Sequence, residues 1–244
     1  MEIDECFSLD LVTAVNRWML SPSADVASLV DKAAANLPVE FRMREAPVFR
    51  RVALGKSSIW QLLGEQSLSE KISSWTLDSA LAKAFDGGVP PVGWQGVIFK
   101  ILPDRGRTVL NIYRLFSSGE FRAAVQKHRA QVPNIEYGID EFSNSESEVI
   151  VELDYLRPED VWSYGGYSAS EAEIIEMAAA EMLGRAPTED ERNYLSTCLK
   201  ASGAKLGAKW ITEEQVKSLQ IGLKDKIKYL QGLKRAQAAW RATD

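Results

Sequence analysis

Apolar residues recur at every third or fourth position near the start of the chain, and this period predicts amphipathic helices over residues 9–20 and 23–37. The period changes after residue 47. Residues 48–54 are rich in β-branched and aromatic side chains and predict a strand, and residues 58–63 predict a short helix after a turn at Gly55. The chain therefore begins with helices and enters a β-rich region near residue 47.

The pattern further along predicts four more strands and several helices. Strands are predicted over residues 71–76, 96–102, 109–116 and 148–153, the last with the strongest strand pattern in the chain. Helices are predicted over residues 77–85, 117–131, 170–183, 188–201 and 212–240, and a polar loop over residues 133–147. Because the strands do not alternate regularly with helices, the pattern favours an α+β fold over a doubly wound parallel sheet.

This order of elements divides the chain into three regions. They are an N-terminal helical flank (residues 1–46), a β-rich core (residues 47–166) and a C-terminal helical region (residues 167–244). In the last predicted helix one stripe is apolar: Val216, Leu219, Leu223, Ile227 and Leu230. Packing of this stripe against the chain's own core is the favoured interpretation, and a surface for a partner is the alternative.

Composition and charge limit the class of protein. With 244 residues and 45% hydrophobic content, the chain can bury one substantial core. A net charge of −5 argues against a dedicated nucleic-acid binder, although a local basic groove is compatible with it. The start of the chain is acidic and no apolar run is long enough to span a bilayer, which predicts a cytoplasmic protein without a membrane segment.

Histidine and cysteine are scarce. His128 is the only histidine, so a catalytic triad or a zinc site would have to be built around this one residue. Cys6 and Cys198 lie far apart in the sequence and match no metal-binding spacing, which predicts free thiols in a reducing cytoplasm. The sequence therefore predicts no metal site.

Candidate chemistry lies in the β-rich core, where three features follow one another. Arg50 follows an aromatic residue in the first strand, Ser74 belongs to a Ser-Trp-Thr step at the end of the second, and Glu146 and Glu148 enter the last. Taken singly, each has an ordinary structural explanation, such as a solvated strand face for the two glutamates. Their order and separation together indicate a common site.

In these features, and in Asp78, Ala82 and Phe85 after the serine step, the chain resembles the ADP-ribosyltransferases of the arginine/serine/Glu-x-Glu type. That family includes binary bacterial toxins and phage enzymes that act on host proteins. The resemblance covers about residues 47–162. It implies a split, mostly antiparallel β-sandwich that uses NAD⁺ as co-substrate, without a metal. The implied reaction transfers ADP-ribose to an arginine of a target protein and releases nicotinamide.

The resemblance also implies roles for individual residues. Arg50 would bind a diphosphate oxygen of NAD⁺ with its planar donor fork. Glu148 would stabilise the oxocarbenium-like centre formed when the bond to nicotinamide breaks, and would bind the ribose 2′-hydroxyl. Ser74 would hold that carboxylate in its working rotamer. Thr76 belongs to the same NAD⁺-binding set, chiefly by shaping the strand end.

Acceptor recognition is assigned to the chain just before the last strand. Residues two apart in a strand point to the same side, so Glu146 can face the same cleft as Glu148. Glu146 would orient or deprotonate the acceptor arginine, because a guanidinium is protonated in water and needs a carboxylate partner to act as a nucleophile. Tyr137 and Phe142 are the aromatic candidates for contact with the acceptor protein.

Two departures from the family pattern leave alternatives open. Where the family often has glycine after the strand arginine, this chain has Arg51, so either Arg50 or Arg51 is a candidate for the NAD⁺ contact; the preceding Phe49 favours Arg50. The segment between the strand at residue 96 and Glu146 is also long and carries an extra helix, which is either acceptor recognition or decoration.

Two other nucleotide-binding patterns are excluded. Gly55-Lys56-Ser57 resembles the end of a P-loop, but the glycine required earlier in that motif is Arg50 here. Gly87-Gly88 lacks the spacing of a dinucleotide fingerprint. The sequence does not imply a Rossmann fold.

Other functions remain open at this stage. The same fold could use water as acceptor, as an NAD⁺ glycohydrolase, or could modify nucleic acid. The chain could also be a non-enzymatic virion or scaffold protein whose helical ends mediate assembly. A phage enzyme acting on proteins of the host cytoplasm is a more natural comparison than a secreted toxin.

Overall fold

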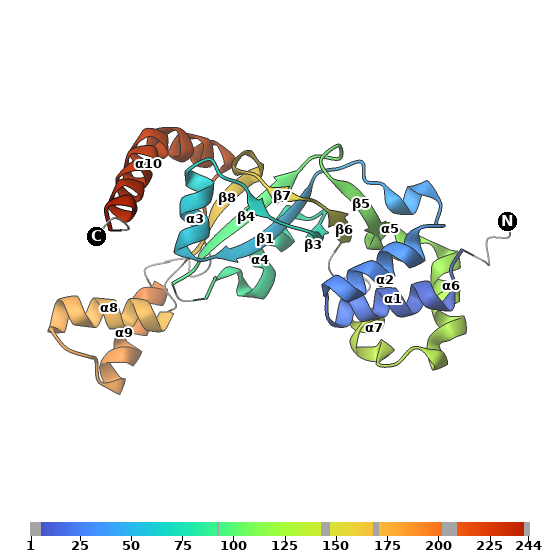
Figure 1. Cartoon of the computed structure of the whole chain (residues 1–244). Helices are drawn as coiled ribbons and strands as arrows, with labels where there is room; N and C mark the ends of the chain where they lie inside the picture. Colours follow the sequence, from blue (N-terminus) through green and yellow to red (C-terminus); the bar gives the residue numbers. More distant parts are fainter. Residues whose placement is uncertain (1–5, 92, 143–146, 168–170, 202–208, 242–244) are drawn as a thin grey trace.

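The computed structural model describes residues 6–91, 93–142, 147–167, 171–201 and 209–241, which form an α+β fold around one large antiparallel sheet (Figure 1). The strands are β1 (Val48–Leu54), β2 (Leu68–Ser69), β3 (Ile72–Thr76), β4 (Gln95–Ile101), β5 (Arg107–Asn111), β6 (Glu148–Glu152), β7 (Tyr155–Leu156), β8 (Val161–Tyr167) and β9 (Lys209–Trp210). The helices are α1 (Leu9–Leu20), α2 (Ala24–Ala34), α3 (Lys56–Leu63), α4 (Ser79–Ala84), α5 (Ile112–Ser117), α6 (Gly119–His128), α7 (Ile139–Phe142), α8 (Glu171–Leu183), α9 (Glu189–Ala201) and α10 (Glu213–Arg241). The predicted α+β class and the antiparallel pairing are confirmed.

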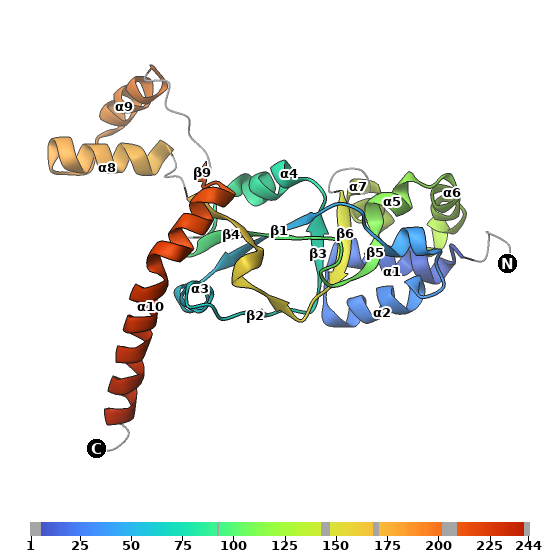
Figure 2. The same cartoon turned by 90° about the horizontal axis from the view of Figure 1, so that it is seen from above.

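The large sheet has the strand order β5-β6-β3-β1-β4-β8-β9, and β2 and β7 pair separately. β1 pairs with β4 along its whole length, and β3 pairs with β6 over five residues. Between them, β1 and β3 share only the pair Phe49↔Thr76. Figure 2 shows that β3 and β6 run across the direction of β1 and β4. A single residue pair therefore joins β1, which carries Arg50, to β3, which carries Ser74.

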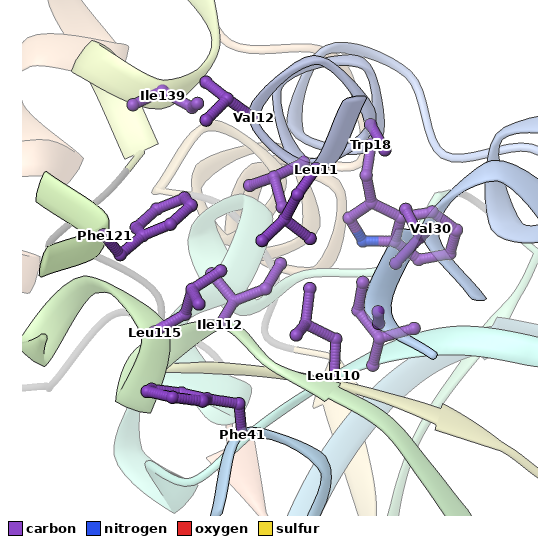
Figure 3. Close-up of a cluster of buried hydrophobic side chains, with 14 of the residues drawn as sticks. Leu11, Val12, Trp18, Val30, Phe41, Leu110, Ile112, Leu115, Phe121 and Ile139 are labelled. Atoms are coloured by element: carbon purple, nitrogen blue, oxygen red, sulfur yellow. The ribbon is translucent and has the colours of Figure 1, made fainter. Parts of the chain in front are cut away.

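The N-terminal helices are part of a hydrophobic cluster that also includes residues of the later strands β5 and β6. Leu11 and Trp18 of α1 and Val30 of α2 pack with Leu110 of β5 and Ile150 of β6 (Figure 3). Helices α5, α6 and α7 complete this end of the molecule (Figures 1 and 2). One shared core thus places α1 directly beside the strand that begins with Glu148.

A second hydrophobic cluster extends from β3 and β6 across the sheet to β8. Val48, Phe99 and Tyr164, from β1, β4 and β8, pack there with Val216 of α10. The apolar stripe of α10 is only partly used by the core, since Val216 and Ile227 are buried whereas Leu219 and Leu230 are 39% and 50% exposed. No helix among the described residues combines the length and the apolar character that crossing a membrane requires.

Two predicted segments differ in the structure. The strand expected over residues 109–116 ends at Asn111, because the Asn111 side chain accepts a hydrogen bond from the backbone N–H of Arg114 (3.0 Å) and caps α5. The loop expected over residues 133–147 contains helical turns at Ile135–Tyr137 and Ile139–Phe142. At Asn111 a local polar contact therefore ends the strand that the apolar pattern predicts.

The local sequence pattern does not indicate the strand residues that follow residue 162. β8 continues to Tyr167 and pairs with the short β9. The Gly165 and Gly166 step has no β-forming side chains to reveal it, yet Gly165 lies so close to β9 that a Cβ atom there would overlap the backbone of Lys209. This pairing between distant segments was therefore invisible to local propensity.

Asn16 of α1 anchors the segment that precedes the glutamate strand. It is buried, its amide donates to the carbonyl of Pro133 (2.9 Å), and its Oδ1 accepts from the backbone N–H of Ile139 (3.0 Å). Gly138 lies against this side chain: a Cβ atom there would overlap Oδ1 of Asn16 and lie 3.0 Å from its Cγ. The segment is held to α1 by contacts that leave no room for a side chain.

Substitution Gly138→Ala is therefore expected to lower the free energy of unfolding by about 1–3 kcal/mol, the usual cost of overpacking a tight site. Urea unfolding monitored by circular dichroism measures this change. Gly119→Ala is the matched control, because the nearest atom to a Cβ at position 119 lies 4.0 Å away. Equal unfolding midpoints for the two variants would contradict the expectation.

Candidate active site

A cleft of about 810 Å³ lies between α1, α2 and the strands β1, β3 and β6. A smaller pocket of about 230 Å³ adjoins it, and both are lined by Arg50, Ser74, Phe85 and Glu148. Small-molecule sites typically occupy roughly 300–1,000 Å³. The structure thus brings together the arginine, the serine and the second glutamate of the predicted constellation, although they come from three strands.

Strand register explains why Ser74 and Glu148 meet. Thr76 of β3 lies opposite Glu148 of β6, and Ser74 is two residues away from Thr76 on the same strand. Side chains two apart point to the same face, so Ser74, Thr76 and Glu148 share one side of the sheet. Ser147, just before Glu148, has a left-handed φ of 47°, a sparsely populated conformation for a residue with a side chain.

Glu148 is buried, with only 7% of its surface exposed, so it does not lie on a solvated strand face. Its Oε1 accepts a hydrogen bond from Trp18 Nε1 (2.8 Å), and Ser74 also hydrogen-bonds to the carboxylate. Burial raises the pKa of Glu148 because the ionised form loses hydration, while the bonds from Ser74 and Trp18 act in the opposite direction. The site therefore holds a carboxylate that is poorly solvated and supported by two neutral donors.

Arg50 lies on the wall of the same cleft. Its Nη1 donates to the carbonyl of Ser74 (3.2 Å), and its Nε lies 3.7 Å from Oε2 of Glu70. The Nε atom is buried without a hydrogen-bond partner among the described residues. Burial lowers the pKa of Arg50 and the charge of Glu70 partly offsets this, yet a guanidinium stays protonated at any ordinary pH. Arg50 thus presents a partly desolvated cation to the cleft.

Arg51 is held by different contacts. Its Nη1 donates to the carbonyl of Phe85, and its guanidinium lies 5.9 Å from the centroid of the Trp210 ring. It lines the smaller pocket, whereas Arg50 lines both. Of the two alternatives that the sequence left open, Arg50 is therefore the one that lines the large cleft.

The remaining predicted site residues are distributed unevenly. Thr76 lines the smaller pocket, and its Oγ1 accepts from the backbone N–H of Asp78 (3.1 Å) at the start of α4. Phe142 lines the large cleft, but Tyr137 is 62% exposed and is not part of the cleft wall. Glu146 lies outside the described residues. The structure therefore places one of the two aromatic acceptor candidates at the site.

Three residues of the site were not predicted from sequence. Trp18 contacts Glu148 across 130 residues of chain, and nothing in the apolar period of its helix distinguishes it from an ordinary core residue. Glu70 lies beside Arg50, and Phe85 lines both pockets; from the sequence, Phe85 was noted only as part of the serine motif. Such partners are visible only once the strands are assembled.

No group of three or more histidine, cysteine, aspartate or glutamate residues within the described ranges is arranged to hold a metal ion. Both cysteines are free thiols, as expected. No family model matches the chain, and no curated protein or solved structure matches it. The geometry of this site is therefore the structural feature that bears on function.

Proposed function

We propose that this chain is a mono-ADP-ribosyltransferase that transfers ADP-ribose from NAD⁺ to an arginine of a target protein and releases nicotinamide. The observation that carries the proposal is the convergence of Arg50, Ser74 and Glu148 on one cleft. The sequence order of these residues matches the family motif. In addition, only the pair Phe49↔Thr76 joins β1 to β3, as expected where a split β-sandwich divides. Both lines of support concern the same three strands.

In this proposal the parts of NAD⁺ meet different walls of the cleft. Arg50 binds the diphosphate, because its planar fork offers paired donors and its buried Nε has no other hydrogen-bond partner among the described residues. Glu148 accepts a hydrogen bond from the ribose 2′-hydroxyl. Its negative charge, in a site of low polarity, stabilises positive charge at the ribose more strongly than a solvated carboxylate would.

The transfer itself exchanges one bond at the ribose C1′ for another. The bond to the nicotinamide nitrogen breaks, and its electron pair leaves with neutral nicotinamide. A guanidinium nitrogen of the acceptor arginine then forms the new bond to C1′, and the proton that it loses passes to a carboxylate, assigned to Glu146 by the family resemblance. Phe142, which lines the cleft, is assigned the contact with the acceptor in this proposal.

The proposal predicts that the purified chain releases nicotinamide from NAD⁺ and attaches ADP-ribose to arginine side chains. Chromatography of the small molecules and mass spectrometry of added acceptor proteins measure the two products separately. Free ADP-ribose as sole product would replace the transferase by a glycohydrolase, and labelled nucleic acid would change the acceptor. Absence of nicotinamide release with protein extracts and nucleic acid both supplied would overturn the proposal in favour of a binding or scaffold role.

A further inference from the structure

Trp18 lies outside the segment that resembles the transferase family, yet its indole N–H donates a hydrogen bond to the carboxylate of Glu148. Its Nε1 lies 2.8 Å from Oε1 of Glu148 and 3.1 Å from Oγ of Ser74. The residue is only 1% exposed and lies at the C-terminal half of α1. One indole N–H therefore bridges the two motif residues that come from β3 and β6.

The indole ring is fixed by packing. Figure 3 shows Trp18 beside Leu11 and Val30 in the N-terminal hydrophobic cluster. Helix α1 is itself fixed at its start, where the Ser8 hydroxyl accepts from the backbone N–H of Leu11 (3.3 Å). A side chain held in this way directs its donor at one point in space, so the carboxylate that accepts the bond is confined to one rotamer.

The chemistry of the donor selects one charge state of its partner. An indole N–H can only donate, and an ionised carboxylate can only accept. The hydrogen bond is therefore stronger to ionised than to protonated Glu148. The charged groups that share the cleft are Arg50 on β1, Glu70 and Lys71 before β3, and Glu152 and Asp154 at the end of β6. The hydrogen bonds on Glu148 itself come from the neutral Trp18 and Ser74.

We infer that Trp18 is a positioning residue that holds Glu148 in one rotamer and favours its ionised form, so that the N-terminal helices complete the catalytic centre. The consequence for turnover rests on the proposed NAD⁺ chemistry. Contact with substrate is not part of this role. Trp18 acts through Glu148 and Ser74.

Trp18→Phe tests the inference, because phenylalanine retains an aromatic ring but has no N–H group. In the folded variant kcat for nicotinamide release is expected to fall about tenfold, the usual effect of losing a hydrogen bond to a charged group, with little change in KM for NAD⁺. The acid limb of the kcat profile is expected to move to higher pH by about one unit, because loss of the donor raises the pKa of Glu148. Trp210→Phe is the control, because the Trp210 Nε1 donates to the carbonyl of Lys83 and not to Glu148. The acid limb of the kcat profile of this variant should match that of the wild type.

A second measurement does not require turnover. In ¹H–¹⁵N spectra of the seven tryptophan indoles, the resonance missing from Trp18→Phe identifies Trp18. We expect this resonance to titrate with pH in the wild type and to stop titrating in Glu148→Gln. If Trp18→Phe does not fold, the resonance that responds to Glu148→Gln identifies Trp18 instead.

The two readouts separate the two proposals. An indole resonance that is indifferent to pH and to Glu148→Gln, or a folded Trp18→Phe with wild-type rate and acid limb, overturns the inference about Trp18. A wild-type protein that releases no nicotinamide overturns the proposed function, and the indole titration still decides whether Trp18 controls the carboxylate.

Discussion

Glu148→Gln is expected to reduce nicotinamide release by at least about a hundredfold, since it removes the charge that opposes the developing positive charge at the ribose. Glutamine preserves the shape of the side chain and can still accept from Trp18 Nε1, which lies 2.8 Å from Oε1. Glu40→Gln, an exposed carboxylate outside the cleft wall, is the control and should retain full activity. Wild-type turnover in Glu148→Gln would refute the assignment of this residue.

The same substitution is expected to stabilise the protein at neutral pH. A solvated strand carboxylate would contribute little to folding, but Glu148 is buried and its pKa is raised, so its ionised form is less favourable in the folded than in the unfolded chain. The contribution of Glu148 to stability is therefore fully present below the unfolded pKa of about 4.3 and is lost as pH rises through the higher folded pKa.

Thermal unfolding measured at two pH values tests this sign. Near pH 8 we expect Glu148→Gln to melt a few degrees above the wild type, because the variant no longer buries a charge. Near pH 4 the difference should shrink, because Glu148 is then protonated in the folded state and mostly protonated in the unfolded chain. A variant that melts below the wild type at pH 8 would show that ionised Glu148 stabilises the fold.

The second large effect is expected at Arg50. Arg50→Lys keeps the charge but removes the planar fork, and we expect KM for NAD⁺ to rise about tenfold or more, as for the loss of a hydrogen bond to a charged group. Arg51→Lys is the matched control, because the Arg51 guanidinium donates to the carbonyl of Phe85 and lies over the ring of Trp210. Steady-state kinetics over a range of NAD⁺ concentrations compares the two variants. A larger effect at Arg51 than at Arg50 would reverse the assignment.

Much of the secondary structure could be predicted from local patterns. The helices α1 and α2 and the strands β1 and β6 appear where the hydrophobic pattern indicates them, because the burial of each element depends on the side chains of consecutive residues. Prediction was wrong where polar contacts between neighbours decided the conformation, as at Asn111, which ends β5 and caps α5. It also missed β9, whose two residues are fixed only by pairing with β8.

The candidate site divides in a similar way. Arg50, Ser74 and Glu148 could be singled out from sequence, because their residue types and order suit one chemistry. Their burial could not, and neither could the roles of Trp18 and Glu70, whose contacts join segments far apart in the chain. The choice between Arg50 and Arg51 likewise required the positions of Phe85 and Trp210.

By itself the sequence determined the α+β class, because periodicity and propensity are properties of short stretches; the antiparallel sheet and the three candidate residues Arg50, Ser74 and Glu148 were expectations from the family resemblance. The tertiary structure alone decided that the N-terminal helices share a core with β5 and β6, and that an indole from α1 reaches the carboxylate of Glu148. The physical reason is that the burial of a charge and the direction of a hydrogen bond depend on which distant segments pack together.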